Sequence, residues 1–590
     1  MYADSPLEWT EDGQPRSRRF GDIYFSAHDG LAETRAVFLQ GCDLPQAWRG
    51  RRRFVVGELG FGTGLNVAAL LDLWRRERPA DAHLHIFTVE AYPLSAGEAA
   101  RALSAWPELA ETADLLIERW PGRANGLHRI DLPEFAAVID LAVMEAAEAL
   151  SGWTGRADAW FLDGFAPALN PDMWRHEVLS LVAARSAPGA MAATFTVAGE
   201  VRRGLAGAGF EVAKRPGFGR KRERLEARAP GRAATDPTHA KVMIIGAGIA
   251  GASAARAVRA LGGEAVVIDA EGPGAGASGN PAALVTPGLD AGLGAKARLF
   301  AQAFRSGVRL YARHPEAILG QGVRQLAAKP GDAGRFARVA ASDLFEPGSM
   351  QALSADGGLD LCAALVIDPA PILAAWCGQS VRARVARLDR DGAGWSALDA
   401  EGRLIARADA VILAAGLGSQ DLAAAAPALT AVRGQLSWAE GVSPPRAAAW
   451  GGYVVPARSG LLFGATHDRG ETGSDLRAAD HARNLATLAA KFPDLAADID
   501  PARLGGRASI RAASADHLPL AGPLEDGLFL LSGFGGRGFT QAPLLAEHVA
   551  ALALGAPSPL PAALQALVTP SRFAERAARR AHSGPTKDAL

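Results

Sequence analysis

The sequence predicts an α/β protein with two nucleotide-binding units in succession, and two observations predict it. An apolar run typical of a buried parallel strand is followed by a glycine-rich turn and a helix twice, at residues 51–74 and at 241–260. Each time, a second apolar run follows and ends in an acidic residue, Glu90 in the first case and Asp269 in the second. Strands that alternate with helices in this way are typical of a parallel sheet covered on both faces.

Length and composition set limits on this prediction. The chain has 590 residues, of which 49% are hydrophobic, so several domains can each form a core. The net charge of −1 argues neither for nor against a nucleic-acid partner. The three cysteines have no paired spacing, which fits a reducing compartment and predicts no zinc site. Because we find no signal peptide and no apolar run of membrane-spanning length, we expect a cytoplasmic protein without a membrane partner. We also expect no metal partner and a monomeric protein.

The first glycine-rich turn has the pattern E-x-G-x-G-x-G. It lies between a predicted strand, Phe54–Val56, and a predicted amphipathic helix, Leu65–Trp74. This pattern resembles the first motif of the class I S-adenosylmethionine methyltransferases, although another dinucleotide or phosphate loop is the alternative. The resemblance implies a Rossmann-like fold in which the turn passes under the methionine part of the cofactor. Its candidate cofactor-binding residues are Glu58, near the cofactor ammonium group, Gly60, Gly62, Gly64 and Asn66.

Three later strand ends favour the methyltransferase interpretation. The strand His85–Val89 leads to Glu90, where a ribose-binding acid is expected, and Val138–Val143 leads to Glu145, where the family places an acid facing the adenine. A further apolar strand, Ala159–Leu162, delivers Asp163 into an aromatic loop. Ligands of open α/β sheets bind outside the carboxyl ends of the strands, so we expect Asp163 in the same crevice, in a catalytic or substrate-positioning role rather than as a turn residue.

The first unit is predicted to end near residue 229. A strand at Ala190–Val197 and a hairpin made of Phe210–Val212 and Arg222–Ala227 complete its sheet. Residues 230–239 are polar and rich in turn formers, so they are the predicted linker between domains 1–229 and 240–590. The segment 214–232 holds eight Lys or Arg against two Glu, but such runs are usually solvated faces and do not by themselves predict RNA binding.

The second glycine-rich turn, G-x-G-x-x-G, predicts a dinucleotide site. Its first glycine, Gly246, makes the tight turn, Gly248 admits the pyrophosphate, and Gly251 allows close packing of helix on strand. Ile249 and Ala250 begin the helix whose N-terminus faces the phosphates. Asp269 follows about 20 residues later, where a carboxylate accepts hydrogen bonds from a ribose.

The remaining loops of this unit resemble those of flavin oxidases such as glycine, sarcosine and D-amino-acid oxidases. Two glycine loops that feed one dinucleotide site indicate FAD rather than NAD. The resemblance implies a glutathione-reductase-like FAD domain with an inserted α+β substrate subdomain, at about 315–390 and 432–500. The further candidate FAD-binding residues are Ser278, Gly279, Asn280, Gly416, Gly533, Gly535, Gly536, Arg537 and Gly538.

Together the two halves resemble the family of bifunctional tRNA 5-methylaminomethyl-2-thiouridine biosynthesis proteins. The segments FGTGLN, WFLDGFAPALNPDMW, GASGN and DHLPLAGP carry this resemblance, and Glu145 and Pro281 depart from the family pattern. The resemblance implies a tRNA substrate modified at its wobble uridine. An FAD-dependent step would convert the 5-carboxymethylaminomethyl group to 5-aminomethyl, and an S-adenosylmethionine-dependent step would then methylate the amine.

The resemblance also implies roles for particular side chains. Asp163 is the candidate that orients the amine and takes its proton. The substrate carboxylate requires an arginine, for which Arg433, Arg511 and Arg537 are candidates. Two alternatives remain. One is a small-molecule amine oxidase fused to an unrelated methyltransferase, and a tRNA-binding assay would distinguish it from a tRNA-modifying enzyme. The other is a scaffold without catalysis, which a yellow purified protein would argue against.

Overall fold

The computed structural model describes residues 5–25, 29–219, 221–232, 241–392 and 394–582, and the chain divides into two compact units. One consists largely of residues 1–238 and the other largely of residues 239–590. Most of the predicted linker, 230–239, lies outside the described residues. Each unit is described by itself below.

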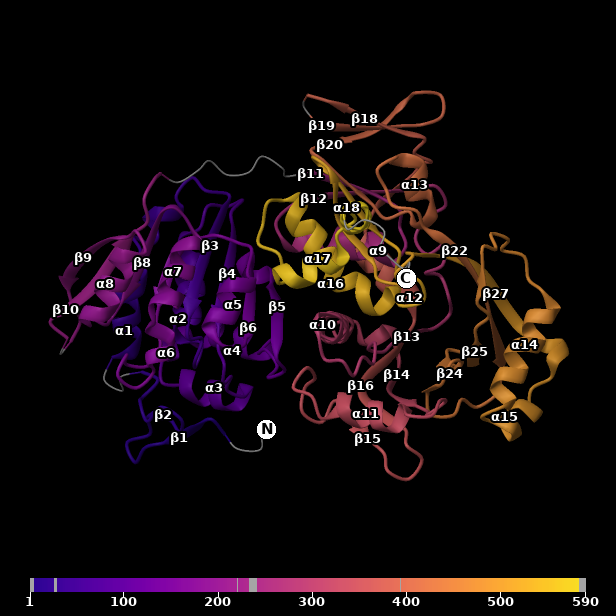
Figure 1. The fold of residues 1–590 in the computed structure, drawn as a ribbon, viewed down its shortest axis with the longest axis horizontal. Helices are drawn as coiled ribbons and strands as arrows, with labels where there is room; N and C mark the ends of the chain where they lie inside the picture. The colour runs from indigo at the N-terminus through magenta and orange to yellow at the C-terminus, as the bar shows by residue number, and fades with distance from the viewer. Residues whose placement is uncertain (1–4, 26–28, 220, 233–240, 393, 583–590) are drawn as a thin grey trace, which may run out of the picture. The chain divides into compact units, whose positions relative to one another are not determined.

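The first unit is organised around an eight-stranded sheet (Figure 1). Across the sheet the strands are β5 (Gly126–Leu132), β6 (Ala137–Val143), β4 (His83–Val89), β3 (Arg53–Leu59), β7 (Ala157–Leu162), β8 (Ser186–Thr194), β10 (Glu223–Arg228) and β9 (Glu211–Pro216). The five strands from β6 to β8 are parallel, and β9 and β10 form the predicted antiparallel hairpin. Two hydrophobic cores cover the sheet, because alternate residues of β3 such as Phe54 and Val55 pack into different cores.

Helices separate these strands, as the sequence predicts. They are α2 (Leu65–Glu77), α3 (Ala96–Leu103), α4 (Ala110–Glu118), α5 (Ala146–Gly152), α6 (Pro171–Trp174), α7 (His176–Ala184) and α8 (Gly199–Gly207). The N-terminal part adds the small sheet of β1 (Leu7–Trp9) and β2 (Pro15–Ser17) and the helix α1 (Gly30–Thr34). β3 lies beside β4 on one side and β7 on the other, so the strand order reverses at β3, the point where doubly wound sheets bind ligands.

The second unit contains a six-stranded nucleotide-binding sheet. Its strands in order are β17 (Ser380–Arg382), β12 (Glu264–Asp269), β11 (Lys241–Ile245), β21 (Ala410–Leu413), β29 (Leu528–Ser532) and β28 (Leu520–Glu525). All neighbours are parallel except β28 and β29. The helices α9 (Ile249–Ala260), α10 (Ala295–Tyr311) and α16 (Gly538–Ala553) belong to this unit, and α16 contacts β28 and β29.

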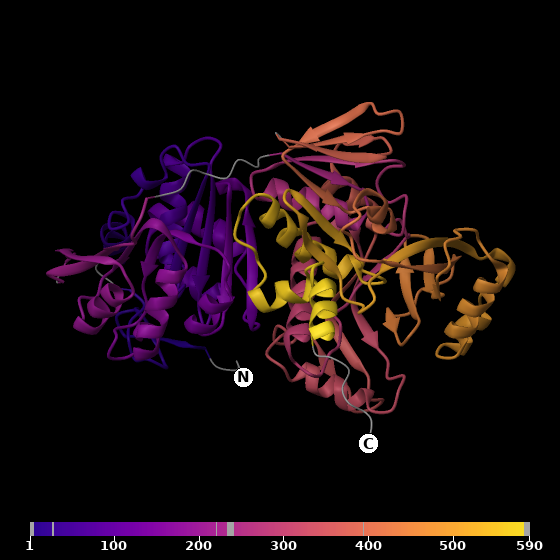
Figure 2. The same ribbon diagram turned by 45° about the horizontal axis from the view of Figure 1, so that its top comes forward.

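A ten-stranded sheet forms the other part of the second unit. It comprises β13 (Ala283–Val285), β14 (Ile318–Gln325), β15 (Gln351–Ala352), β16 (Leu359–Ile367), β22 (Thr430–Glu440), β23 (Ala448–Ala449), β24 (Tyr453–Ala457), β25 (Gly460–Gly464), β26 (Asp468–Arg469) and β27 (Gly505–Ala513). α14 (Ala478–Ala489) packs on β22 and β25 beside α15 (Pro493–Ala497) (Figures 1 and 2). Two strands depart from the predicted subdomain ranges: β17 lies within 315–390 but joins the nucleotide sheet, and β27 lies past residue 500 but belongs to the second sheet.

Shorter elements complete this unit. They are a three-stranded sheet of β18 (Arg387–Asp391), β19 (Gly394–Leu398) and β20 (Leu404–Ala408), and the helices α11 (Asp332–Ala340), α12 (Pro369–Cys377), α13 (Ser419–Leu422), α17 (Ala562–Val568) and α18 (Arg572–His582). Across the described part of the chain, no helix has both the length and the apolar character that crossing a membrane requires.

The last long helix begins earlier than the sequence predicts. The sequence places its start near Leu544, after a proline, but α16 begins at Gly538 and includes Pro543. A proline within a helix leaves the carbonyl four residues earlier without its N–H partner. Here that carbonyl, of Phe539, accepts a hydrogen bond from the Tyr311 hydroxyl at 2.7 Å instead. A buried tyrosine from α10 therefore stabilises the helix where the backbone cannot.

Candidate functional sites

The first unit has a cavity of about 690 Å³ at the carboxyl ends of β3, β4, β6 and β7. The predicted site residues that line it are Gly60, Gly62, Asn66, Glu90, Glu145 and Asp163. They come from four separate strand ends, which a parallel sheet brings to one edge. Glu58 and Gly64 are not among the lining residues.

The glycine-rich turn between β3 and α2 needs its glycines. Gly60, Gly62 and Gly64 have φ angles of +89°, +50° and +78°, a region that other residues rarely adopt. A side chain at Gly60 would also lie 3.3 Å from the backbone of Gly164, the residue after Asp163. The turn therefore presents bare backbone to the cavity, as binding of a cofactor along it requires.

Two further acids lie beside this turn. Glu90 accepts hydrogen bonds from the backbone N–H groups of Gly62 and Tyr92, each at 2.9 Å, and burial raises its pKa. It therefore holds the turn in place and also lines the cavity, where a ribose is expected. Glu145 is exposed at the cavity edge, with the Tyr92 hydroxyl 3.4 Å from its carboxylate.

Glu58 lies behind the turn. Its side chain, 1% exposed, accepts a hydrogen bond from the Thr88 hydroxyl at 2.6 Å. Burial raises the pKa of Glu58 to about 8, so the neutral acid is the main form at pH 7. Glu58 is not among the residues that line the cavity, so this placement gives it a supporting position beneath the loop, and its contact with a cofactor ammonium group stays a prediction.

Asp163 is held by a chain of hydrogen bonds. The Thr34 hydroxyl donates to Asn66 Oδ1 at 2.8 Å, and Asn66 Nδ2 donates to Asp163 Oδ2 at 2.7 Å. The first bond fixes which end of the amide faces Asp163. Burial raises the pKa of Asp163 to about 6, while the donors from Gly164 and Asn66 favour its ionised form. Asp163 is therefore a carboxylate poised to exchange a proton near neutral pH.

The N-terminal segment closes part of this cavity, which the sequence did not predict. The rings of Phe20 and Tyr24 pack on Phe165 with centroid distances of 5.0 and 5.1 Å. Asp22 accepts a hydrogen bond from the backbone of the same loop. Lys221 pairs with Glu33 at 2.7 Å, and both line the cavity. These contacts join segments far apart in sequence, so no local pattern could indicate them.

The second unit has a cavity of about 1160 Å³ between its two sheets. The predicted residues that line it are Gly246, Gly248, Ile249, Ala250, Asp269, Ser278, Asn280, Gly416, Arg511, Gly533, Gly535, Gly536, Arg537 and Gly538. Gly251 and Gly279 support it from behind. A side chain at Gly251 would meet the carbonyl of Gly246 at 1.8 Å, and one at Gly279 would meet the carbonyl of Gly274 at 2.0 Å.

Side chains fix the loops around this glycine cradle. Ser278 accepts a hydrogen bond from the backbone of Ile249 at 2.9 Å, at the start of α9. Asp269 accepts one from Ala247 at 2.8 Å and two from the loop after β12. The bare glycine backbone at the start of α9 borders the cavity, and a helix N-terminus of this kind suits a pyrophosphate. The cradle thus fits the dinucleotide that the sequence predicts.

Of the three candidate arginines, two line the cavity. Arg511 and Arg537 donate to the carbonyls of Thr466 and Pro287, and within the described residues neither has a carboxylate partner within 4.0 Å. Burial lowers the pKa of Arg511. Arginines placed in a cavity without an acidic partner are suited to bind an anionic group.

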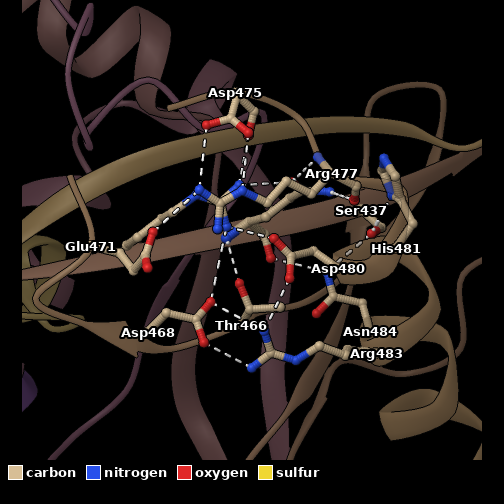
Figure 3. A network of polar contacts seen from close by, with 12 residues as sticks. Ser437, Thr466, Asp468, Glu471, Asp475, Arg477, Asp480, His481, Arg483 and Asn484 are labelled. Carbon is tan, nitrogen blue, oxygen red and sulfur yellow. Dashed lines mark hydrogen bonds and ion pairs between the residues drawn. The ribbon is translucent and has the colours of Figure 1, made fainter. Parts of the chain in front are cut away.

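Arg433, the third candidate, lies elsewhere. It is fully buried and pairs with Asp480. Figure 3 shows Asp480 within a polar network that also includes Asp468, Asp475 and Arg483. The register explains the difference, because Arg511 is opposite Val432 and Arg433 is opposite Ile510. Neighbouring residues of a strand point to opposite faces, so Arg433 and Arg511 are on different sides of the sheet. The geometry gives Arg433 a structural ion pair rather than access to the cavity.

Comparison with known proteins agrees with these two sites. Residues 107–230 match the family of S-adenosyl-L-methionine-dependent methyltransferases, and residues 241–552 match the FAD-dependent oxidoreductases. The first unit therefore carries an S-adenosyl-L-methionine-dependent methyltransferase domain and the second an FAD-dependent oxidoreductase domain, and the prediction of both cofactors is confirmed. Within the described residues, no group of three or more His, Cys, Asp or Glu is arranged to hold a metal ion.

Full-length relatives specify the family further. The chain is 59% identical to the tRNA 5-methylaminomethyl-2-thiouridine biosynthesis bifunctional protein MnmC of Caulobacter vibrioides, over 97% of this chain and 98% of that protein. It is 44% identical to the protein of the same name from Maricaulis maris, over 99% of both chains. At these identities and coverages, the chain belongs to the MnmC family of bifunctional tRNA-modifying enzymes.

Proposed function

We propose that the protein performs two successive reactions on the wobble uridine of tRNA. In the first, the FAD-dependent domain converts the 5-carboxymethylaminomethyl group of a uridine or 2-thiouridine to 5-aminomethyl. In the second, the methyltransferase domain transfers a methyl group to the new primary amine, which gives 5-methylaminomethyl. The names of the full-length relatives and the chemistry of the two cavities support this proposal.

The oxidation requires the substrate carboxylate to be held beside the flavin. Arg511 and Arg537 supply the positive charge, and Arg537 belongs to the same glycine loop, Gly533–Gly538, that borders the cavity. Bound FAD would accept a hydride from the carboxymethyl carbon while the secondary amine loses its proton, so that a carbon–nitrogen double bond forms. The resulting imine takes up water, and its hydrolysis releases the carboxymethyl carbons as glyoxylate and leaves the aminomethyl group on the uridine. The arginines hold the carboxylate throughout, because they bind charge and take no proton.

The methyl transfer requires an amine that has lost its proton. An ammonium group has no lone pair, so it cannot attack the methyl group of the sulfonium. Asp163 can accept a hydrogen bond from the amine and take its proton, because its pKa of about 6 leaves it mostly ionised at pH 7 to 8. Asn66 and Thr34 keep its carboxylate in one orientation. The aromatic residues of the cavity, Phe20, Tyr24 and Phe165, offer surfaces on which a base can stack.

The observation that best supports the methyl-transfer assignment is the position of Asp163. It lies at the carboxyl end of β7, across from the glycine turn that would hold the cofactor, and it is oriented from behind. Among the described residues that line this cavity, no other acid has both features. Asp163 is therefore the side chain by which to test the second reaction.

Nucleoside mass spectrometry of tRNA carrying the carboxymethylaminomethyl group tests the proposal. Without S-adenosylmethionine the aminomethyl nucleoside should accumulate, and with it the methylated nucleoside should form. Asp163→Asn should stop at the aminomethyl stage, with flavin content unchanged. If the purified protein binds both cofactors but leaves the tRNA unchanged, the proposal is wrong and a small-molecule amine oxidase becomes the better assignment.

A further inference from the structure

Arg511 lies in an unusual position against the backbone of β22. Arg511 is on β27, directly opposite Val432, and Gly434 is the diagonal neighbour on the same face of the sheet. A Cβ atom at Gly434 would lie 2.0 Å from Nη2 and 2.7 Å from Cζ of Arg511. The guanidinium group therefore occupies the volume where any other residue would carry its side chain.

The neighbouring groups hold the guanidinium in this position. Nη2 donates to the carbonyl of Thr466 at 2.9 Å. Thr466 is itself fixed on β22, since its hydroxyl accepts a hydrogen bond from the backbone of Gln435 at 2.9 Å and its N–H donates to the Gln435 carbonyl at 3.0 Å. Nη1 points the other way, 3.6 Å from the place a Cβ at Gly536 would occupy in the last glycine loop. Arg511 thus extends from β22 to the loop that borders the flavin position.

The backbone conformation at position 434 does not require glycine. Its φ angle is not in the left-handed region, and it lies in the regular β22–β27 ladder opposite Ser509. A Cβ atom added at Gly434 would come closer than 3.0 Å only to the flexible end of Arg511, and the nearest backbone atom, the Thr466 carbonyl oxygen, would be at 3.0 Å. A side chain at this position therefore requires the guanidinium group to move away, while the Thr466 carbonyl needs to shift only slightly.

We propose that Gly434, with the carbonyl of Thr466, is a positioning element that sets where the substrate carboxylate binds, by seating the Nη2 end of the Arg511 guanidinium against bare backbone. This inference rests on the proposed function, in which Arg511 holds the carboxylate. A bidentate pair between guanidinium and carboxylate depends on orientation, so displacement of Arg511 by even one methyl group loses it. Gly434 is not a catalytic residue, because it acts only through Arg511.

The test uses the full-length holoenzyme and steady-state oxidation of carboxymethylaminomethyl-modified tRNA. Gly434→Ala should raise KM and lower kcat/KM by about 10- to 100-fold, the range that loss of a charge-assisted hydrogen bond gives. Arg511→Ala should give a loss of similar size. Flavin content and the thermal midpoint of the Gly434→Ala protein should match those of the parent. The matched control is Gly334→Ala, on the exposed face of α11 in the same unit, where an added Cβ meets nothing within 4 Å; it should leave KM unchanged.

A double variant separates displacement of Arg511 from general damage. If Gly434 acts through the guanidinium, Gly434→Ala should have no further effect in the Arg511→Ala background, even if the single variant folds poorly. Additive losses in the double variant would overturn the inference. So would an unchanged KM in Gly434→Ala beside a raised KM in Arg511→Ala. An unchanged KM in Arg511→Ala would instead refute the proposed role of Arg511 itself, so the two failures are distinguishable.

Discussion

The hydrogen bond between Asn66 and Asp163 should set the pH dependence of methyl transfer. The bond is 2.7 Å long, and it stabilises the ionised form of Asp163, whose pKa is about 6. Replacing Asn66 with alanine removes this donor while leaving the backbone donor of Gly164. A hydrogen bond to a charged group contributes about 1.5 to 3 kcal/mol. At about 1.4 kcal/mol per pKa unit, its loss should raise the pKa of Asp163 by about one to two units.

The measurement is kcat/KM for methyl transfer to aminomethyl-modified tRNA between pH 5 and 9, at saturating S-adenosylmethionine. The parent should gain activity as pH rises through about 6, because Asp163 acts in its ionised form. In Asn66→Ala that rise should move to about pH 7 to 8. Asp163→Asn tests whether Asp163 produces this rise in kcat/KM, because the variant should lack the rise near pH 6. Thr34→Val is an intermediate control. It keeps the Asn66 donor but removes the hydrogen bond that orients the amide, so the rise in kcat/KM should move to higher pH by less than in Asn66→Ala.

One result would refute this reasoning. If Asn66→Ala lowers the rate uniformly but leaves the rise near pH 6 in place, then the amide does not stabilise the Asp163 carboxylate. Asn66 would then act on the cofactor alone. If kcat/KM still rises near pH 6 in Asp163→Asn, another group, such as the substrate amine, produces this pH dependence.

Three further predictions test buried groups. The pKa of Glu58 is about 8 in the folded chain against an ordinary 4.5, so the unfolded chain loses this proton at lower pH. The free energy of unfolding should therefore fall as pH rises from about 4.5 to 8. Urea unfolding of Glu58→Gln should lack this decrease. Gly251→Ala should give colourless protein by absorbance at 450 nm, because its methyl group would meet the Gly246 carbonyl at 1.8 Å. Asp480→Ala leaves the buried Arg433 without its main partner and should cost about 3 to 5 kcal/mol in urea unfolding, whereas loss of an exposed pair should cost under about 1 kcal/mol.

The strands and turns of both nucleotide-binding sheets could be predicted because their signals are local. In β3 and the turn after it, buried apolar residues and three glycines with positive φ follow one another within 12 residues, from Arg53 to Gly64. The carboxyl ends of parallel strands meet at one edge, so the grouping of Glu90 and Asp163 also follows from the pattern. The motif alone, however, does not distinguish a carboxylate that lines the cavity from one beneath the loop, and Glu58 belongs to the second kind.

The arginines show what the sequence could not supply. Arg433 and Arg511 are both candidates from the sequence alone, which shows only that Arg511 is closer to the last glycine loop along the chain. Their difference is set by the pairing of β22 with β27, strands about 70 residues apart in the chain, whose register places the two side chains on opposite faces. The same register brings Gly434 under Arg511. Long-range pairing thus decides which arginine faces the cavity, and no local pattern indicates it.

The charges of the two cavities favour the proposed order of reactions. The first substrate carries both an ammonium group and a carboxylate, and Arg511 and Arg537 attract the carboxylate. In the proposed first reaction, oxidation and hydrolysis would remove that carboxylate and leave a primary ammonium group, which the same arginines would repel. Glu145 and Asp163 line the methyltransferase cavity, so the ammonium group of this product would be attracted there. Methyl transfer then turns a cationic sulfonium into a neutral thioether, which weakens the attraction of this acidic cavity for the spent cofactor.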